Sequence, residues 1–302
     1  GGGGGKIIMK RMTTALGAAA CLVLNAALPA RAADAVPDYV TAAVNAPGRL
    51  LVEKVSDADR KPTELAAFST AKPGDKVLEL VPGGGYYTRV LSNIVGASGK
   101  VYAVVPLPTS AQALYRRMQE SAMRGVPLPA DTVAPMLELQ STYDYTNVVV
   151  MAPMISQYGG HISVPEQLDV VWSNTYHDLK NGEFGPVKSD LINAAIFAAL
   201  KPGGVYLIVD GSAPGQGFGA VSFLHRSDPE AVKKEVIAAG FVLDGESKAL
   251  ANAADNHSHA VWDASVRGKP DQFILRFKKP ANASPADKRR VPMPWTAITA
   301  TP

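Results

Sequence analysis

The stretch that most constrains the fold is residues 76–91, where a short apolar run meets three consecutive glycines. Residues 77–81 predict a buried strand, residues 83–85 a tight turn, and the amphipathic residues after them a helix. Glycine lets a backbone turn left-handed and approach a ligand closely. Such a turn at the start of a helix presents backbone N–H groups to a small polar ligand. The segment therefore predicts a binding loop in an α/β domain.

The residues from Glu79 to Gly85, Glu-Leu-Val-Pro-Gly-Gly-Gly, resemble a known motif. They are similar to motif I (E/D-x-G-x-G-x-G) of the class I S-adenosylmethionine-dependent methyltransferases. Gly83 and Gly85 match the second and third glycines of that motif, whereas Val81 stands at the first. Residues 50–280 are similar, in order, to a bacterial group of exported predicted methyltransferases of unknown substrate. Glycine-rich turns also occur in other α/β domains, and that alternative stays open.

Strand and helix patterns alternate along the chain and predict a doubly wound, Rossmann-like α/β fold with a mainly parallel sheet. Seven strands are expected, at residues 77–81, 101–105, 147–151, 168–173, 205–210, 241–243 and 272–277. No helical pattern separates the last two, and a parallel crossover usually needs a helix, so a C-terminal antiparallel strand is expected. The predicted organisation is a leader and signal peptide (1–32), N-terminal helices (33–70), a methyltransferase-like α/β domain (71–280) and a flexible Pro/Ala-rich tail (281–302).

The N-terminal segment has the pattern of a secretory signal peptide. Basic residues precede an apolar stretch at 15–28, and Ala30-Arg31-Ala32 offers a small-x-small cleavage site. We expect export, to the periplasm, with cleavage near Ala32 and no stable membrane anchor; an uncleaved anchor is the alternative. Cys21, the only cysteine, lies in this segment. The mature chain would therefore have no disulfide, thiolate metal site or cysteine nucleophile.

The charge balance argues against nucleic acid as a partner. The chain has 30 Lys and Arg against 27 Asp and Glu, and four of the basic residues fall in the expected leader. The remainder has a net charge of −1, which gives no excess of positive charge for binding nucleic acid. The expected partner is a small-molecule methyl acceptor, and the oligomeric state is left open.

The resemblance implies S-adenosylmethionine as the cofactor. The residues that it implies for cofactor binding are Glu79, Pro82, Gly83, Gly84, Gly85, Tyr86 and Asn174. In the family an acidic residue after the second strand usually holds the ribose hydroxyls, but Val105-Pro106 stands there in this chain. The loss of two hydrogen bonds to a carboxylate would cost about 2–5 kcal/mol of binding free energy.

The catalytic candidates follow the fourth expected strand, where the resemblance places the transferable methyl group. Tyr176 would pack over the methyl, His177 would act as a base because its ordinary pKa is near neutrality, and Asp178 would orient His177. His225, after the fifth strand, would be a second base or a substrate contact. The structural alternatives are that Asp178 caps a helix, His177 fills a loop, and His225 is a satisfied surface histidine.

No metal site is expected. Asp255, His257 and His259 are weakly consistent with one, but a solvated insert or lid over the substrate is favoured. The leading hypothesis is an S-adenosylmethionine-dependent methyltransferase that transfers the methyl group in line to an unidentified small molecule. The alternative is an exported, non-catalytic ligand-binding protein on the same fold. A nicotinamide oxidoreductase is disfavoured because the sequence lacks G-x-G-x-x-G.

Overall fold

The structure is a computed structural model, and it describes residues 1–3, 35–105, 134–153, 164–181, 189–266, 268–283 and 295–297. The chain divides into two units, Gly1–Ala35 and Val36–Pro302, and the second holds every helix and strand described below. Nearly all of the expected signal peptide lies outside the described residues. Within the described part of the chain, no helix combines the length and the apolar character needed to cross a bilayer.

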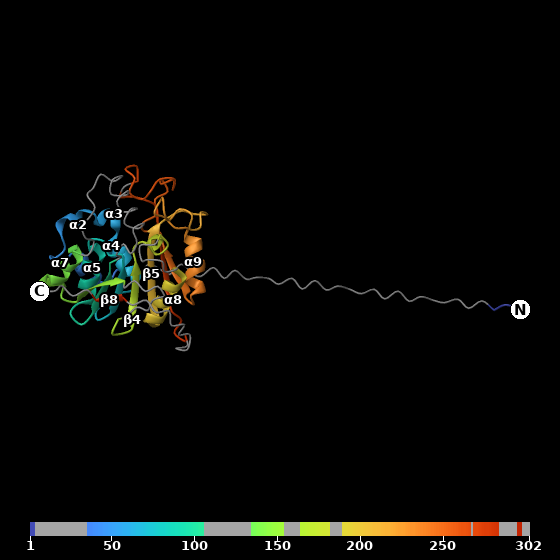
Figure 1. The fold of residues 1–302 in the computed structure, drawn as a ribbon, viewed down its shortest axis with the longest axis horizontal. Helices are drawn as coiled ribbons and strands as arrows, with labels where there is room; N and C mark the ends of the chain where they lie inside the picture. Colours follow the sequence, from blue (N-terminus) through green and yellow to red (C-terminus); the bar gives the residue numbers. More distant parts are fainter. Residues whose placement is uncertain are drawn as a thin grey trace. The chain divides into compact units, whose positions relative to one another are not determined.

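The strands form one sheet in the order β6-β7-β5-β4-β1-β2-β3-β8 (Figure 1). Strands β1 to β5 run parallel, whereas β7 is antiparallel to both of its neighbours, β5 and β6. The seven expected strands and the antiparallel pairing of the last two are thereby confirmed. The bounds are β1 Lys76–Leu80, β2 Lys100–Val104, β3 Val148–Pro153, β4 Leu168–Ser173, β5 Leu200–Gly211, β6 Val242–Ser247, β7 Gln272–Lys278 and β8 Trp295–Ala297.

The sequence analysis does not predict β8, a three-residue strand that pairs antiparallel with β3. It falls within residues 281–302, the expected tail. Strand β5 begins at Leu200, five residues before the expected start at residue 205. The ladder between β4 and β5 shifts its register after Leu168, and Gly203 there has φ +80°. The glycine lets the strand bend locally rather than turn away from the sheet.

The helices begin where the sequence supplies helix-starting residues. Helix α9 starts at Pro229, and the Asp228 side chain caps it by accepting a hydrogen bond of 3.0 Å from the Glu230 N–H. Pro62 is likewise the first residue of α4, although no side chain caps that helix. The bounds are α1 Asp38–Val44, α2 Leu51–Val55, α3 Asp57–Arg60, α4 Pro62–Ser69, α5 Tyr86–Val95, α7 Ala134–Ser141, α8 Ser189–Ala199 and α9 Pro229–Ala238, with 3-10 turns η1 Tyr143–Tyr145 and η2 Tyr176–Leu179.

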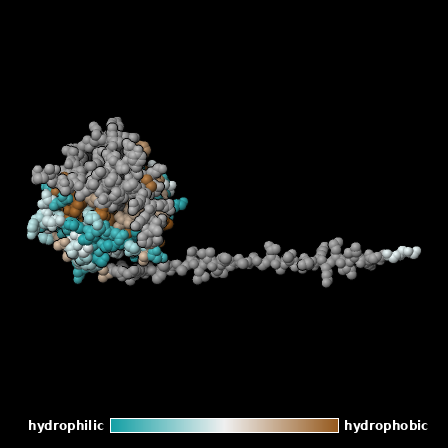
Figure 2. Space-filling view, turned by 60° about the horizontal axis from the view of Figure 1, so that its bottom comes forward, coloured by the Kyte–Doolittle hydropathy of each residue, from teal (hydrophilic) through white to brown (hydrophobic). Residues whose placement is uncertain are grey.

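Two apolar layers enclose the sheet, one on each face. Side chains alternate along a strand, so Val77 joins the layer formed with α1, α4 and α5, while Leu78 and Leu80 join the layer formed with α8 and α9. Figure 1 shows α4 and α5 on the opposite side of the strands from α8 and α9. Burial on both faces explains why the parallel strands are continuous apolar runs. On the face that Figure 2 shows, most of the described surface is hydrophilic, with hydrophobic residues beside the grey atoms.

Candidate functional site

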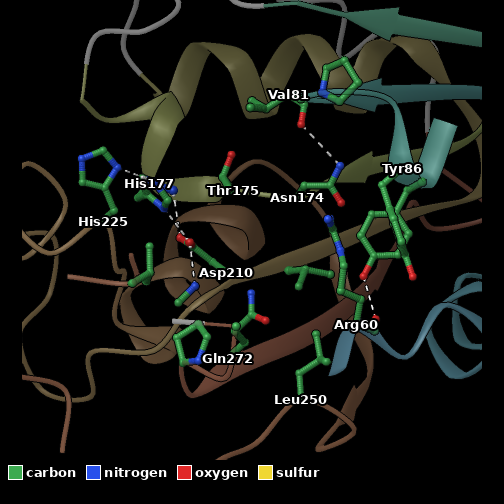
Figure 3. A pocket seen from close by; sticks show the side chains of 18 of the residues that line it. Arg60, Val81, Tyr86, Asn174, Thr175, His177, Asp210, His225, Leu250 and Gln272 are labelled. Carbon is green, nitrogen blue, oxygen red and sulfur yellow. Dashed lines mark hydrogen bonds and ion pairs between the residues drawn. The ribbon is translucent and has the colours of Figure 1, made fainter. Parts of the chain in front are cut away.

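A cavity of about 450 Å³ lies at the carboxyl ends of β1, β4 and β5. The strand order reverses between β1 and β4, and open α/β sheets bind ligands at such a switch point. The volume suits a small organic ligand, since ligand pockets measure about 300–1,000 Å³. Two groups of side chains face the cavity (Figure 3). We call them the glycine-turn end (Arg60, Val81, Pro82, Gly83, Gly84, Tyr86 and Asn174) and the histidine end (His177, Asp210 and His225).

The glycine turn after β1 places open backbone against the cavity. A Cβ atom added at Gly83 or Gly84 would meet no described atom within 4 Å. Gly83 also has φ +57°, a conformation that only glycine adopts without strain. Gly85 serves the fold instead, because a Cβ there would approach Leu139 Cδ1 at 2.6 Å. Of the residues implied for cofactor binding, Glu79 and Gly85 do not line the cavity and the other five do.

Val81, at the position of the first glycine of the motif, also has a positive φ of +57°. A β-branched residue rarely adopts this conformation, which brings Cβ close to the carbonyl oxygen. Its carbonyl oxygen accepts a 3.5 Å hydrogen bond from Asn174 Nδ2. The turn therefore keeps the backbone conformation of a glycine although the residue is valine.

Glu79 is fully buried beneath the turn rather than facing the cavity. Its carboxylate accepts hydrogen bonds of 2.5 Å from Thr88 Oγ1 and 2.9 Å from Asn174 Nδ2. Burial raises the pKa of Glu79 to about 7, although these hydrogen bonds oppose the shift. Asn174 is held in turn by Trp172, whose Nε1 donates to its Oδ1 at 2.6 Å. Glu79 thus fixes the orientation of Asn174, which does line the cavity.

Two tyrosines and an arginine form a wall of the glycine-turn end. The Arg60 guanidinium lies 3.9 Å from the ring centroid of Tyr86 and 5.0 Å from that of Tyr87. The Tyr86 hydroxyl donates to Asp57, and burial together with this hydrogen bond raises the pKa of Tyr86. Tyr86 is among the residues predicted from the sequence, whereas Arg60 is not, because no local motif marks it. The wall combines aromatic faces with a positive charge.

The histidine end is built around His177 on η2. Its backbone N–H donates to Asp210 Oδ2 at 2.8 Å, and its ring Nδ1 lies 2.6 Å from Asp210 Oδ1. A carboxylate only accepts hydrogen bonds, so this contact assigns the proton to Nδ1 and leaves a lone pair on Nε2. The sequence analysis misses Asp210, although an acid that ends the apolar run of β5 is a signal that could have found it.

His225 and Asp178 complete the cluster around His177 Nε2. The His225 Nδ1 atom lies 3.1 Å from that nitrogen, and Asp178 Oδ1 lies 3.3 Å from it. Asp178 also accepts hydrogen bonds of 2.7 Å from Thr175 Oγ1 and from Asn181 Nδ2. Burial acts to raise the pKa of Asp178, but the neighbouring His177 and His225, together with these two hydrogen bonds, outweigh burial and hold that pKa below its usual value. The structure therefore brings three of the four catalytic candidates together.

The fourth candidate, Tyr176, lies on the other side of η2 among the residues of α8 and α9. Its hydroxyl donates to Glu235 Oε2 at 2.7 Å and accepts from Asn193 Nδ2 at 2.6 Å. Tyr176 is fully buried and does not line the cavity. The structure does not bring it to the site.

The segment between β6 and β7, which contains Asp255, His257 and His259 of the predicted insert, supplies a further wall of the cavity through Leu250, Val261, Gly268 and Pro270. A buried ion pair holds this segment: Arg226 Nη2 donates to Asp255 Oδ2 at 2.7 Å, and both side chains are 0% exposed. The histidines of the insert have separate carboxylate partners. His257 Nε2 lies 2.8 Å from Asp271, and His259 Nδ1 lies 3.7 Å from Asp263. They do not converge on one point.

Sequence comparison places the chain beside methyltransferases. It is 30% identical over 121 residues to the protein-L-isoaspartate O-methyltransferase of Methanothrix thermoacetophila, a match that covers 36% of this chain and 57% of that protein. It is 36% identical over 55 residues to the enzyme of the same name from Aeropyrum pernix, which covers 18% of this chain and 21% of the relative. The chain thus spans little more than half the length of the first relative. No protein-family model matches the chain.

Among solved structures, a SAM-dependent methyltransferase from Aquifex aeolicus aligns with a TM-score of 0.42 and 17% identity, over 76% of this chain and 95% of that one. The sheet is the one that the resemblance implies, mostly parallel with a terminal antiparallel pair. Together with the sequence relatives, the sheet bears out the resemblance to class I methyltransferases, whereas the resemblance to an exported group stays a prediction. The chain is similar to the class I S-adenosylmethionine-dependent methyltransferases.

Proposed function

We propose that this protein is an S-adenosylmethionine-dependent methyltransferase that acts on a small molecule. The observation that carries the proposal is a single cavity at the switch point of the sheet, which joins an open glycine turn to a cluster of histidines. One end offers backbone for binding a cofactor, and the other offers groups that can accept a proton. Its sequence relatives are named as methyltransferases, which supports the same chemistry.

The residues at the glycine-turn end fit the expected cofactor. Gly83 and Gly84 leave space against the backbone, where a side chain would fill the cavity. Arg60 offers a cation for a carboxylate, and the Tyr86 ring offers an aromatic face. The amide of Asn174 is held in place by Glu79 and can donate or accept. S-adenosylmethionine would supply an electrophilic methyl group on a sulfonium, so this chain has to position it and exclude water.

The histidine end would receive the acceptor. In the transfer, a lone pair of the acceptor forms a bond to the methyl carbon while the carbon–sulfur bond breaks and its electrons return to sulfur. The proton released by a hydroxyl or amino acceptor has to leave. His177 Nε2 can take this proton, since Asp210 holds the other ring nitrogen and stabilises the resulting imidazolium. We further propose that the enzyme acts after export, because its N-terminal segment has the signal-peptide pattern.

Calorimetry on the full chain tests the proposal. S-adenosylmethionine and its demethylated product are expected to bind with micromolar affinity. In the series Gly84→Ala, Gly84→Leu and Gly84→Phe, affinity should fall as the side chain grows, because each fills open space in the cavity. Gly219→Ala is the control, since Gly219 does not line the cavity and lacks a positive φ.

The absence of binding at millimolar cofactor, with a cooperatively folded protein, would reject the proposal and leave a binding protein for another ligand. If the cofactor binds, the protein can be incubated with it and a metabolite extract. A mass-spectrometric search for compounds that gain one methyl group then identifies the acceptor. Omission of S-adenosylmethionine is the control for that search.

A further inference from the structure

His177 and His225 of the histidine end, together with the adjacent Asp178, bring metal-binding atoms close to one another. His177 Nε2 lies 3.3 Å from Asp178 Oδ1 and 3.1 Å from His225 Nδ1. One ligand atom from each residue lies within 4.8 Å of the other two. Around a zinc ion with bonds of about 2.0–2.1 Å, tetrahedral geometry separates neighbouring ligand atoms by about 3.4 Å. The two measured spacings are close to those of a coordination shell.

The orientation of His177 agrees with this arrangement. Metal-binding histidines almost always donate their second ring N–H to a carboxylate, a carbonyl or a water. Asp210 fills that role at Nδ1, at 2.6 Å, and directs the lone pair of Nε2 towards the carboxylate of Asp178. Two electron-rich atoms this close repel each other unless a proton or a cation lies between them.

The backbone at His225 is a third, independent observation. This residue has φ +52°, which a residue other than glycine seldom adopts. Its neighbours hold it there: Ser227 N donates to Gly211 O at 2.9 Å, and Val261 N donates to Leu224 O at 3.2 Å. Strained backbone of this kind clusters at functional sites. The strain presents the His225 ring to the cavity and to His177.

We propose that His177, Asp178 and His225 bind a divalent transition-metal ion, with Asp210 as the residue that positions His177. Two imidazoles and one carboxylate favour Zn²⁺, Fe²⁺ or Co²⁺ over Mg²⁺ or Ca²⁺, which prefer oxygen ligands alone. Three protein ligands leave a coordination position open, as in catalytic zinc sites. Because both histidines line the cavity, the open position faces it. The sequence alone predicts no metal here, since residues 177 and 225 are far apart in the chain.

The metal site suggests the class of acceptor, and this part of the inference rests on the proposed methyl transfer. A hydroxyl that coordinates the ion loses its proton to water near neutral pH, because the cation stabilises the oxyanion. The oxygen keeps the electron pair that forms the bond to the methyl carbon. The metal would then replace His177 as the group that activates the acceptor. A phenol or alcohol with its oxygen on the metal is the substrate class that this geometry favours.

The test is a metal titration of the full chain, produced without a polyhistidine tag and stripped with a chelator. Calorimetry with Zn²⁺ and Co²⁺ should show one ion per chain, and the visible spectrum of bound Co²⁺ should report four or five ligands that include nitrogen. Neither measurement needs the cofactor or the acceptor. If metal binds but S-adenosylmethionine does not, the site stands and the proposed function fails.

Substitutions in the cluster test which residues bind the metal. His225→Asn keeps a residue that tolerates a positive φ but removes the imidazole, and it should weaken Co²⁺ binding at least 100-fold. Asp210→Asn should weaken it about 10–100-fold through the orientation of His177. The matched control is His257→Ala, a histidine paired with Asp271 outside the cluster, which should bind Co²⁺ normally. Thermal unfolding verifies that each variant folds. A wild-type chain without stoichiometric binding, or a His225→Asn chain that binds as well as the wild type, would overturn the proposal.

Discussion

The glycine-turn end and the histidine end of the cavity differ in where their polar groups point. At the glycine-turn end the carboxylate of Glu79 is withdrawn beneath the turn, and the cavity meets open backbone at Gly83 and Gly84. At the histidine end side chains reach the cavity, and the carboxylate of Asp210 orients a ring that lines it. In both places a buried acid acts through a neighbour. The difference is that the first acid holds an amide, while the second holds a titratable and metal-binding group.

The comparison points first to the buried ion pair between Arg226 and Asp255 beside the histidine end. The largest effect is expected for Arg226→Met, next to His225. It leaves the fully buried carboxylate of Asp255 without its cation and should lower the free energy of unfolding by about 3–5 kcal/mol. Urea denaturation measures this change. The control is Arg276→Met, whose partner Asp244 is partly exposed and which should cost about 1 kcal/mol. Equal losses of unfolding free energy in the two variants would show that the buried pair contributes no more to stability than the partly exposed pair.

Glu79→Gln tests the raised pKa of the carboxylate buried beneath the glycine turn. Its pKa is about 7 in the folded protein against 4.5 when unfolded, so between these values the folded state binds more protons. Stability should therefore fall as pH rises from about 4.5 to about 7 and level off above, by up to about 3 kcal/mol. The glutamine variant lacks this slope, so its stability relative to the wild type should increase across the window. Denaturation at a series of pH values measures it, and Glu64→Gln on α4 is the control. Parallel profiles for wild type and Glu79→Gln would contradict a raised pKa.

Arg60→Met tests whether the two ends of the cavity bind their ligands independently. The substitution removes a cation that faces the glycine-turn end but keeps an apolar chain against Tyr86. We expect binding of the demethylated cofactor to weaken about tenfold, on the scale of one hydrogen bond to a charged group. Co²⁺ binding at the histidine end should not change. Lys201→Met, which removes the partner of Asp169 away from the cavity, is the control. Equal losses of both ligands would show that the ends are not independent.

The smallest effect is expected at Val81. Val81→Gly relieves the positive φ, worth about 1–2 kcal/mol, at an entropic cost of about 0.5–1 kcal/mol. A gain in stability of up to about 1 kcal/mol is expected in thermal unfolding. Val81→Ala keeps a Cβ atom and should show no gain. If alanine stabilises the protein as much as glycine, the backbone conformation is not the cause.

The glycine-turn end could be predicted from the sequence because its signals are local. Residues 76–91 contain the strand, the turn and the first helical residues, and the structure has them within one residue of the expected positions. The withdrawal of Glu79 was not predicted, since it depends on Thr88 and Asn174 packing from two other elements. Arg60 could not be predicted for the same reason, because it reaches the cavity from a separate element, α3.

The histidine end could be predicted only in part. His177, Asp178 and His225 stand near strand ends, so each could be predicted as a single candidate residue. Their convergence depends on the register between β4 and β5 and on the strained backbone at His225, and neither can be read from spacing. Tyr176 shows the converse: its position beside His177 in the chain suggested a place in the cavity, but η2 turns the two side chains to opposite sides.

The short strand β8 has a practical consequence for anyone who shortens this chain. It occupies the outer edge of β3 along Met151–Pro153, which would otherwise present unsatisfied main-chain groups to a second molecule. Truncation after residue 283 would uncover that edge while removing none of the described residues of the two apolar layers. Such a fragment should still fold, yet associate edge to edge and precipitate more readily than the parent. A purification tag should therefore not replace residues 295–297.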